Sequence, residues 1–120
     1  IGAYLQSQGI GTLGADIFLG LMPDQPDNCI ALFEYAGSPP DLHWNGEYPG
    51  LQVRVRNKSY AAARSKIGEV IEKLHGLHEQ TLSGTRYLLI RARGSPEVLK
   101  RDASNRVELF VNFEIIKERD

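Results

Sequence analysis

Three glycines near the start of the chain have the spacing of a nucleotide-binding motif. Gly9, Gly11 and Gly14 fit the pattern G-x-G-x-x-G, and Glu34 lies twenty residues after the last of them. In a dinucleotide site the glycines follow a strand and open a helix, whose N-terminus meets the pyrophosphate. Here a helical segment precedes the glycines and a strand-like segment at 16–19 follows them. We therefore interpret them as turn glycines and predict no cofactor.

Three histidines and one cysteine are the residues from which a metal site or a nucleophile would be built. His75 and His78 are three apart, but Gly76 ends the predicted helix between them and no acidic or cysteine partner is suitably spaced. The lone Cys29 lies in an apolar run and is expected to pack as a small hydrophobic side chain. No nucleophile elbow, P-loop or paired-carboxylate signature occurs. We therefore predict no catalytic residue, no metal site and no enzymatic activity.

Four arginines lie on two predicted strands and could form a basic stripe on one sheet face: Arg54, Arg56, Arg91 and Arg93. Such a stripe would suit a nucleic acid, but both strands lack the aromatic pattern of an RNA-binding sheet. We interpret the arginines as partners of Glu108 and Glu114 across the sheet, or of a neighbouring subunit. A small α+β nucleic-acid-binding module that uses the C-terminal basic residues is the alternative function.

The charge of the chain is divided unevenly along its length, although the formal net charge is only −1. The first 53 residues hold six acidic residues and no Lys or Arg, a net charge of −6, whereas the remainder holds all 14 basic residues and nine acidic ones, a net charge of +5. Such asymmetry predicts complementary surfaces for association. The alternative is that folding interleaves the two halves and mixes their charges over one surface.

The stretch 49–76 predicts a strand followed directly by a helix. Over 50–57, apolar residues alternate with polar ones, which is the period of a strand with one buried face. Ser59 is a candidate N-cap for a helix over 59–75, and an apolar stripe follows at helical spacing: Ala63, Ile67, Val70, Ile71 and Leu74. Gly68 costs about 1 kcal/mol relative to Ala inside a helix. A close approach of the helix to the sheet would explain this glycine.

The rest of the chain predicts further strands around this unit. We expect a helix ending near Gln8, strands at 16–19 and 28–35, a loop over 36–48, and a C-terminal hairpin of 85–93 and 106–117 joined by a twelve-residue polar connection. These elements predict an α+β sandwich, in which a mixed, mostly antiparallel sheet packs against one main helix plus an N-terminal helix. The whole chain, 1–120, is expected to form a single domain. No apolar run approaches the ~18 residues of a membrane helix, so no membrane partner is expected.

Two exposed features are candidate contact sites. The outward face of the last strand should be polar, but Phe110 and Ile116 interrupt it, so this face is either an interface or is covered by a second helix, such as the N-terminal one. The loop 36–48 holds the only tryptophan, Trp44, with Tyr48 beside it. Aromatic residues in a long loop make good interface anchors. The alternative is that Trp44 folds back as a lid over the edge of the core.

The order of these segments resembles a known family. The apolar strand 29–35, the loop with prolines, the strand 49–56 (PGLQVRVR), the helix start 59–64 (SYAAAR) and its end at 74–76 (LHG) are similar to the minor capsid and tail-terminator proteins of tailed bacteriophages. The resemblance is strongest over 16–76, and the strand–helix junction is its most specific part. It implies an α/β sandwich fold and a structural virion protein.

The resemblance also implies a place of action and partners. Such a protein would assemble in the host cytoplasm into a homo-oligomeric ring, a hexamer in the family pattern, at the head–tail junction of the virion. It would cap the tail tube, contact the tail tube protein and join the tail to the head-completion or connector protein. We expect contacts between subunits, or with these partners, at Arg54, Arg56, Arg91, Arg93, Trp44, Tyr48 and Phe110. No specific nucleic acid is expected as a partner.

Overall fold

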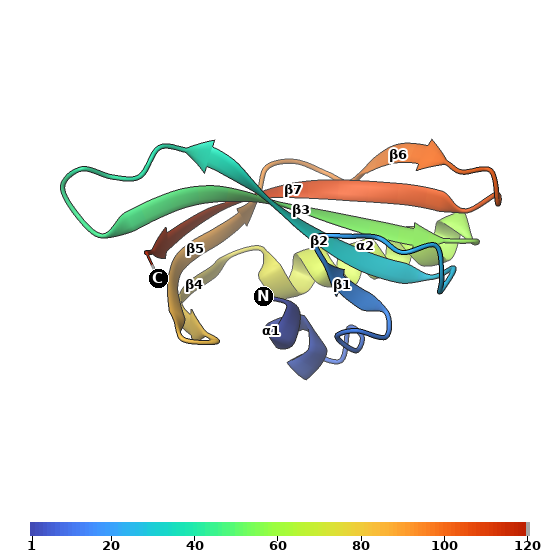
Figure 1. The fold of residues 1–120 in the computed structure, drawn as a ribbon, viewed down its shortest axis with the longest axis horizontal. Coiled ribbons are helices and arrows are strands. Elements are labelled where there is room, and N and C mark those ends of the chain that lie inside the picture. Colours follow the sequence, from blue (N-terminus) through green and yellow to red (C-terminus); the bar gives the residue numbers. More distant parts are fainter. Residues whose placement is uncertain (120) are drawn as a thin grey trace.

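The computed structural model describes residues 1–119 and consists of one sheet with two helices on one side of it (Figure 1). The helices are α1 (Gly2–Ser7) and α2 (Tyr60–Leu74). The strands are β1 (Ile17–Leu19), β2 (Cys29–Ser38), β3 (Gly46–Asn57), β4 (Leu77–Leu82), β5 (Thr85–Ala92), β6 (Glu97–Arg101) and β7 (Val107–Glu118). The α+β class expected from the sequence is confirmed. The sheet curls as an open half-barrel, so the predicted sandwich remains only an expectation.

The seven strands form a mixed sheet in the order β1-β2-β3-β7-β5-β4. Only the β1–β2 pair is parallel, and β3 runs antiparallel to β7 along the full length of both strands. On its other edge β7 pairs with β6 near its start and with β5 near its end, so β5 and β6 lie one after the other along β7. The β3–β7 pair therefore lies at the centre of the sheet, with β2 on one side of it and β5 and β6 on the other.

One face of the sheet, here called the inner face, carries the hydrophobic core. Val53, Val55, Leu109, Val111 and Phe113 are fully or almost fully buried there. The buried cluster also includes the helical residues Leu5, Ala63, Ile67, Val70 and Leu74. Both helices lie on this side in Figure 1. The period-two pattern of the sequence thus assigned the buried residues of β3 and β7 correctly.

The long helix α2 begins and ends as its sequence indicates. Ser59 is the N-cap, and its Oγ accepts a hydrogen bond from the backbone N–H of Ala62 at 3.2 Å. The helix ends at Leu74, and Gly76 follows with a φ of +86°, which favours glycine. Gly68 is exposed, and a Cβ there would meet open space. The expectation that a close approach to the sheet explains Gly68 is therefore wrong.

Three segments differ from the sequence-based expectation. Strands β2 and β3 extend well into the predicted loop 36–48, so that only 39–45 connects them, and they form the long hairpin that projects from the body of the sheet in Figure 1. Strand β4 was not predicted, since its residues are mostly polar and exposed. The predicted polar connection of the C-terminal hairpin contains β6, whose residues are all exposed. Edge strands such as these have no buried face, so hydrophobic alternation does not reveal them.

Candidate subunit interface

The opposite face of the sheet, here called the outer face, holds most of the residues expected to contact a partner. The register places Arg54 opposite Phe110 and Arg56 opposite Glu108 on β3 and β7. Within residues 1–119 no helix covers this face, because α1 and α2 both belong to the inner side. Covering of Phe110 by the N-terminal helix, one of the two alternatives, is therefore wrong. The outer face is available for contact with another protein.

Arg54 lies in the middle of the outer face and is held by its neighbours. Its guanidinium carbon is 4.7 Å from the centre of the Phe33 ring, a cation–π geometry. Its Nε donates a hydrogen bond to Oε1 of Gln52 at 2.7 Å. Phe110, its cross-strand partner, is partly buried. Arginine and aromatic side chains held rigidly on an open sheet face are the composition typical of interface anchors.

Arg56 differs from Arg54 because it is buried, with only 4% of its surface exposed. Its guanidinium donates hydrogen bonds to the backbone carbonyls of the loop between β1 and β2: those of Pro23, Asp24, Pro26 and Asp27. This loop folds over the end of the outer face and accepts the hydrogen bonds of both Nε and Nη2. Arg56 was expected to contact a neighbouring subunit, but its role within the chain is to hold the loop.

Arg106 holds the same loop from the other side, and together we call these two residues the arginine clamp. Its Nε donates to Oδ2 of Asp102 at 2.8 Å and its Nη2 to Oδ1 of Asp24 at 2.9 Å. Its Nη1 donates to Asp27 and to the carbonyl of Asp24. These carboxylates raise the pKa of Arg106 further above its ordinary value. The sequence offered no sign of this role, since Arg106 stands at the start of the predicted strand 106–117, directly after a polar connection that holds other cations.

The arginine clamp also neutralises part of the uneven charge of the sequence. Asp24 and Asp27 belong to the acidic first half of the chain, and they pair with Arg106 and Lys58 of the basic second half. The hydrogen bond from Lys58 is the main cause that lowers the pKa of Asp27. Part of the asymmetry is therefore neutralised within the subunit. Glu34 and Glu47, by contrast, form no salt bridge within residues 1–119.

The other two predicted arginines lie beside a groove on the outer face near the base of the β2–β3 hairpin. The groove has a volume of about 460 Å³, and its lining includes Tyr35, Tyr48, Gly50, Arg91, Arg93 and Glu114. Arg91 forms a salt bridge with Glu114 across the β5–β7 pair, as expected. Arg93 is exposed, and its guanidinium has no ion-pair partner within residues 1–119. Arg93 is thus a cation that a partner protein can reach.

The ring of Tyr35 explains a glycine in this groove. A Cβ at Gly50 would overlap that ring, so only glycine lets Tyr35 lie flat across β3. Tyr35 remains about one-third exposed above it. The groove therefore has a fixed aromatic wall on one side and the two arginines on the other.

The end of the hairpin carries Trp44 and Tyr48 in one hydrogen-bonded group. The indole Nε1 of Trp44 donates to the Tyr48 hydroxyl at 3.1 Å, and that hydroxyl donates to Oδ2 of Asp41 at 2.8 Å. The backbone N–H of His43 and this hydroxyl lower the pKa of Asp41. Trp44 lies against Gly46 within the hairpin and does not join the buried cluster. The alternative of a lid over the core is not what the structure shows.

The described chain offers little for catalysis. Among residues 1–119 no group of three or more His, Cys, Asp or Glu side chains could hold a metal ion. Cys29 is buried, and burial raises the pKa of its thiol, which disfavours a reactive thiolate. No helix in the part of the chain that the structure describes is long and apolar enough to cross a membrane.

Comparison with known proteins identifies the family of this chain. A family model described as bacteriophage tail terminator protein matches residues 4–119, nearly the whole chain. A chain in the virion of a native gene transfer agent particle has a similar structure, with a TM-score of 0.70 and 15% sequence identity over 99% of this chain and 87% of that one. At this identity the likeness shows a shared fold. No curated protein matches the sequence. The match to the family model shows that this chain belongs to the bacteriophage tail terminator family, whose members are structural proteins and not enzymes.

Proposed function

We propose that this protein ends the growth of the phage tail tube and joins the tail to the head connector, acting as a ring-shaped homo-oligomer at the head–tail junction of the virion. The observation that carries the proposal is the match to the tail terminator family over residues 4–119. The similar fold of a chain in a gene transfer agent virion supports a place within a virion. A hexamer is the ring size that the family resemblance favours.

Ring formation needs two different patches on each subunit, because a head-to-tail contact closes only when one surface meets another by rotation. The outer face and its groove supply one patch, with Arg54, Arg91 and Arg93 as its cations. Trp44, Tyr48 and Phe110 supply aromatic surface beside it. Acidic side chains of the next subunit, the tail tube protein or the connector protein would be its partners. Arg56 is left out because it is buried within the subunit.

The alternative of a nucleic-acid-binding module has less support from the geometry. Of the four arginines expected to form a basic stripe, Arg56 is buried and Arg91 is paired with Glu114. Only Arg54 and Arg93 remain, and both lie on a sheet that also carries Glu108 and Glu114. Phosphate binding depends on a concentration of unpaired cations. The outer face is better suited to a protein partner of mixed charge.

Tails assembled with and without this protein test the function directly. We expect electron micrographs of particles lacking it to show tails of irregular, excessive length or tails not joined to heads, and we expect the wild-type chain supplied in trans to restore normal particles. Joined tails of normal length in its absence would contradict the proposal.

Native mass spectrometry across a salt series tests the ring interface. Arg93→Glu should weaken self-association, and added salt should weaken that of the wild type, because both act on charge pairs at an exposed interface. Arg64→Glu is the matched control, since Arg64 is an exposed arginine on α2, away from the outer face. An oligomer that is indifferent to salt, to Arg54→Glu and to Arg93→Glu would exclude the arginines from the interface.

A further inference from the structure

The turn at the end of the β2–β3 hairpin presents one apolar side chain to solvent. Leu42 is 93% exposed, the most of any large hydrophobic residue in the described chain. It lies between Asp41 and Trp44, which are fixed by the hydrogen bonds through Tyr48. A side chain on a turn held in this way loses little conformational freedom when it binds. Leu42 therefore has the properties of an anchor that inserts into an apolar site.

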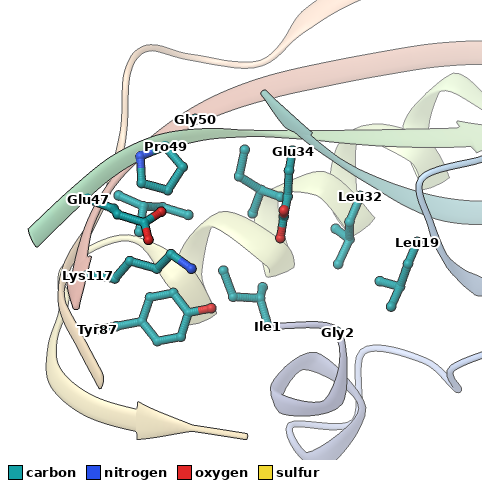
Figure 2. A pocket seen from close by; sticks show the side chains of 12 residues that line it. Ile1, Gly2, Leu19, Leu32, Glu34, Glu47, Pro49, Gly50, Tyr87 and Lys117 are labelled. Carbon is teal, nitrogen blue, oxygen red and sulfur yellow. The ribbon is translucent and has the colours of Figure 1, made fainter. Parts of the chain in front are cut away.

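A cavity with room for such a side chain, aliphatic over part of its lining, opens on the inner side of the same molecule. It has a volume of about 180 Å³, and Leu19, Leu32, Leu51 and Ile115 contribute to its lining (Figure 2). A cavity of about 150 Å³ lined by aliphatic side chains can hold benzene, so this one can hold the side chain of a leucine. Leu19 stands at its mouth and is 58% exposed.

The charges around Leu42 and around the cavity are complementary. Beside Leu42, the guanidinium of Arg119 is held by Asn45, whose Oδ1 accepts from its Nε at 2.9 Å, and Arg119 forms no salt bridge within residues 1–119. The cavity lining holds two carboxyl groups, those of Glu34 and Glu47, and one side-chain cation, Lys117, as Figure 2 shows. A cation therefore accompanies the apolar anchor, and acidic side chains outnumber basic ones in the lining of the cavity.

We propose that Leu42 of one subunit inserts into the inner cavity of the neighbouring subunit, with Arg119 beside Glu34 or Glu47 of that neighbour. This inference rests on the proposed ring assembly and names one contact within it, in addition to the contacts of the outer face. The anchor and the cavity are different patches of one chain, so the contact is head-to-tail and can be repeated around a ring. It also covers two apolar surfaces that the isolated subunit leaves open to water.

Disulfide trapping between two differently tagged copies tests the contact. In a Cys29→Ala background, a Leu42→Cys protein is mixed with a Leu19→Cys protein at high concentration under mild oxidation. We expect a disulfide between the two tagged chains, because the two positions meet only between subunits. Tyr60→Cys replaces Leu19→Cys in the control, since Tyr60 is 50% exposed and stands at the start of α2, outside the cavity lining. Equal yields in the two mixtures, or no disulfide, would overturn the proposal.

Substitutions measure the strength of the contact. Leu42→Ala should weaken self-association about tenfold, which corresponds to about 1.4 kcal/mol, because it removes most of the apolar side chain that the contact buries. Leu19→Arg should block the cavity mouth, whereas Leu21→Arg should have no effect. Leu21 is 54% exposed and stands two residues away, but it does not line the cavity. Circular dichroism checks that each variant is folded, and Leu42 is far enough from the core for its substitution to leave folding intact.

Tail assembly separates a failure of this inference from a failure of the proposed function. If Leu42→Arg and Leu19→Arg proteins both terminate tails as the wild type does, the contact is overturned and the terminator function stands. If both fail while Leu21→Arg succeeds, the contact is supported. If tails are normal in the complete absence of the protein, the terminator function is wrong, and the trapping experiment alone then decides whether the contact exists.

Discussion

At the scale of single residues, Arg54 and Arg56 show how neighbouring positions on one strand face can have different roles. Both point to the outer face of β3, two residues apart. Arg54 stays at the surface above Phe33, whereas Arg56 is covered by the loop between β1 and β2. A period of two predicts the face to which a side chain points. It does not predict which loop will lie over that face.

Replacing Arg106 should destabilise the fold more than replacing any exposed arginine. Arg106→Met removes a buried cation and leaves Asp24, Asp27 and Asp102 without their shared partner, a change that we expect to cost about 3 kcal/mol in the free energy of unfolding. Arg86→Met is the matched control, because Arg86 forms an exposed pair with Glu118 that should be worth less than about 1 kcal/mol. Urea denaturation measures both, and equal effects would contradict a structural role for the clamp.

Gly68→Ala should stabilise the protein. Gly68 lies in the interior of α2 with open space where its Cβ would be, so alanine adds helix propensity without a clash. We expect a gain of about 0.5–1 kcal/mol in the free energy of unfolding. Thermal or urea denaturation checks it. A loss of stability would mean that position 68 is packed against something in the folded protein.

At the scale of elements, the loop at 22–28 is shaped by ionic contacts more than by apolar packing. Arg56 and Arg106 bind its carbonyls and carboxylates, and Lys58 pairs with Asp27 at 3.2 Å. The loop thereby joins the start of β2 to the turn before β7, elements far apart in the sequence. Its stability should depend on pH, since the bound form needs ionised carboxylates.

The acid stability of the protein should reflect this loop. Lys58 lowers the pKa of Asp27, and the backbone N–H of Arg106 is the main cause that lowers the pKa of Asp102. A carboxyl whose pKa is lower in the folded state stabilises the fold above its ordinary pKa of about 3.9 and loses that contribution as the pH falls through the folded value. We therefore expect the urea midpoint to be steady between about pH 7 and 5 and to drop below about pH 4.

A pair of variants measures how much the Asp102 carboxyl contributes to the loss of stability at low pH. Asp102→Asn should flatten the drop in the urea midpoint at low pH, because one of the responsible carboxyls is gone. Glu97→Gln, an exposed position on β6, should leave the drop unchanged. The same steep drop in the Asp102→Asn protein would show that other carboxyls govern the acid response.

At the scale of the whole molecule, one buried cluster connects the two helices to five of the strands. Ile67 is fully buried in this cluster, while Ile71 packs at its edge and is partly exposed. We therefore expect Ile67→Asp to abolish the folded state and Ile71→Asp to leave a folded, less stable protein. Circular dichroism and gel filtration distinguish the two results. Equal unfolding of both variants would mean that the edge of the cluster is as essential as its centre.

The wild-type protein should unfold in one cooperative transition, since its core is shared by elements from both ends of the chain. Urea curves followed by far-UV circular dichroism and by hydrodynamic radius should coincide. Two separate transitions would contradict the expectation of a single domain over 1–120.

The predictable part of this fold is the part with regular apolar periodicity. Strand β3, helix α2 and the buried face of β7 follow directly from alternation and from the stripe that includes Ile67 and Val70. Strands β4 and β6 were missed because both lie at edges and are stabilised by backbone pairing to a neighbour, which leaves no pattern of side chains. The same applies to the far part of the β2–β3 hairpin, where the residues of β2 are exposed.

The candidate interface was predictable only in part for a related reason. The arginines, Trp44, Tyr48 and Phe110 could be selected by residue type, and the structure places most of them on one exposed side of the sheet and its hairpin. Leu42 and the inner cavity were not selected. A single exposed leucine has no periodic signal, and a cavity is formed by side chains from several strands.

The sequence by itself determined the α+β class, the strand–helix unit of β3 and α2, the buried face of β7 and the lack of a recognisable catalytic motif. These depend on the order of residues within short segments, where a side chain's neighbours are known from its position. Only the tertiary structure decided that Arg56 and Arg106 are buried around one loop, that both helices leave the outer face open, and that Leu42 stands apart on the hairpin. These depend on which distant segments meet, because burial and charge pairing are properties of the assembled surface and not of the local pattern.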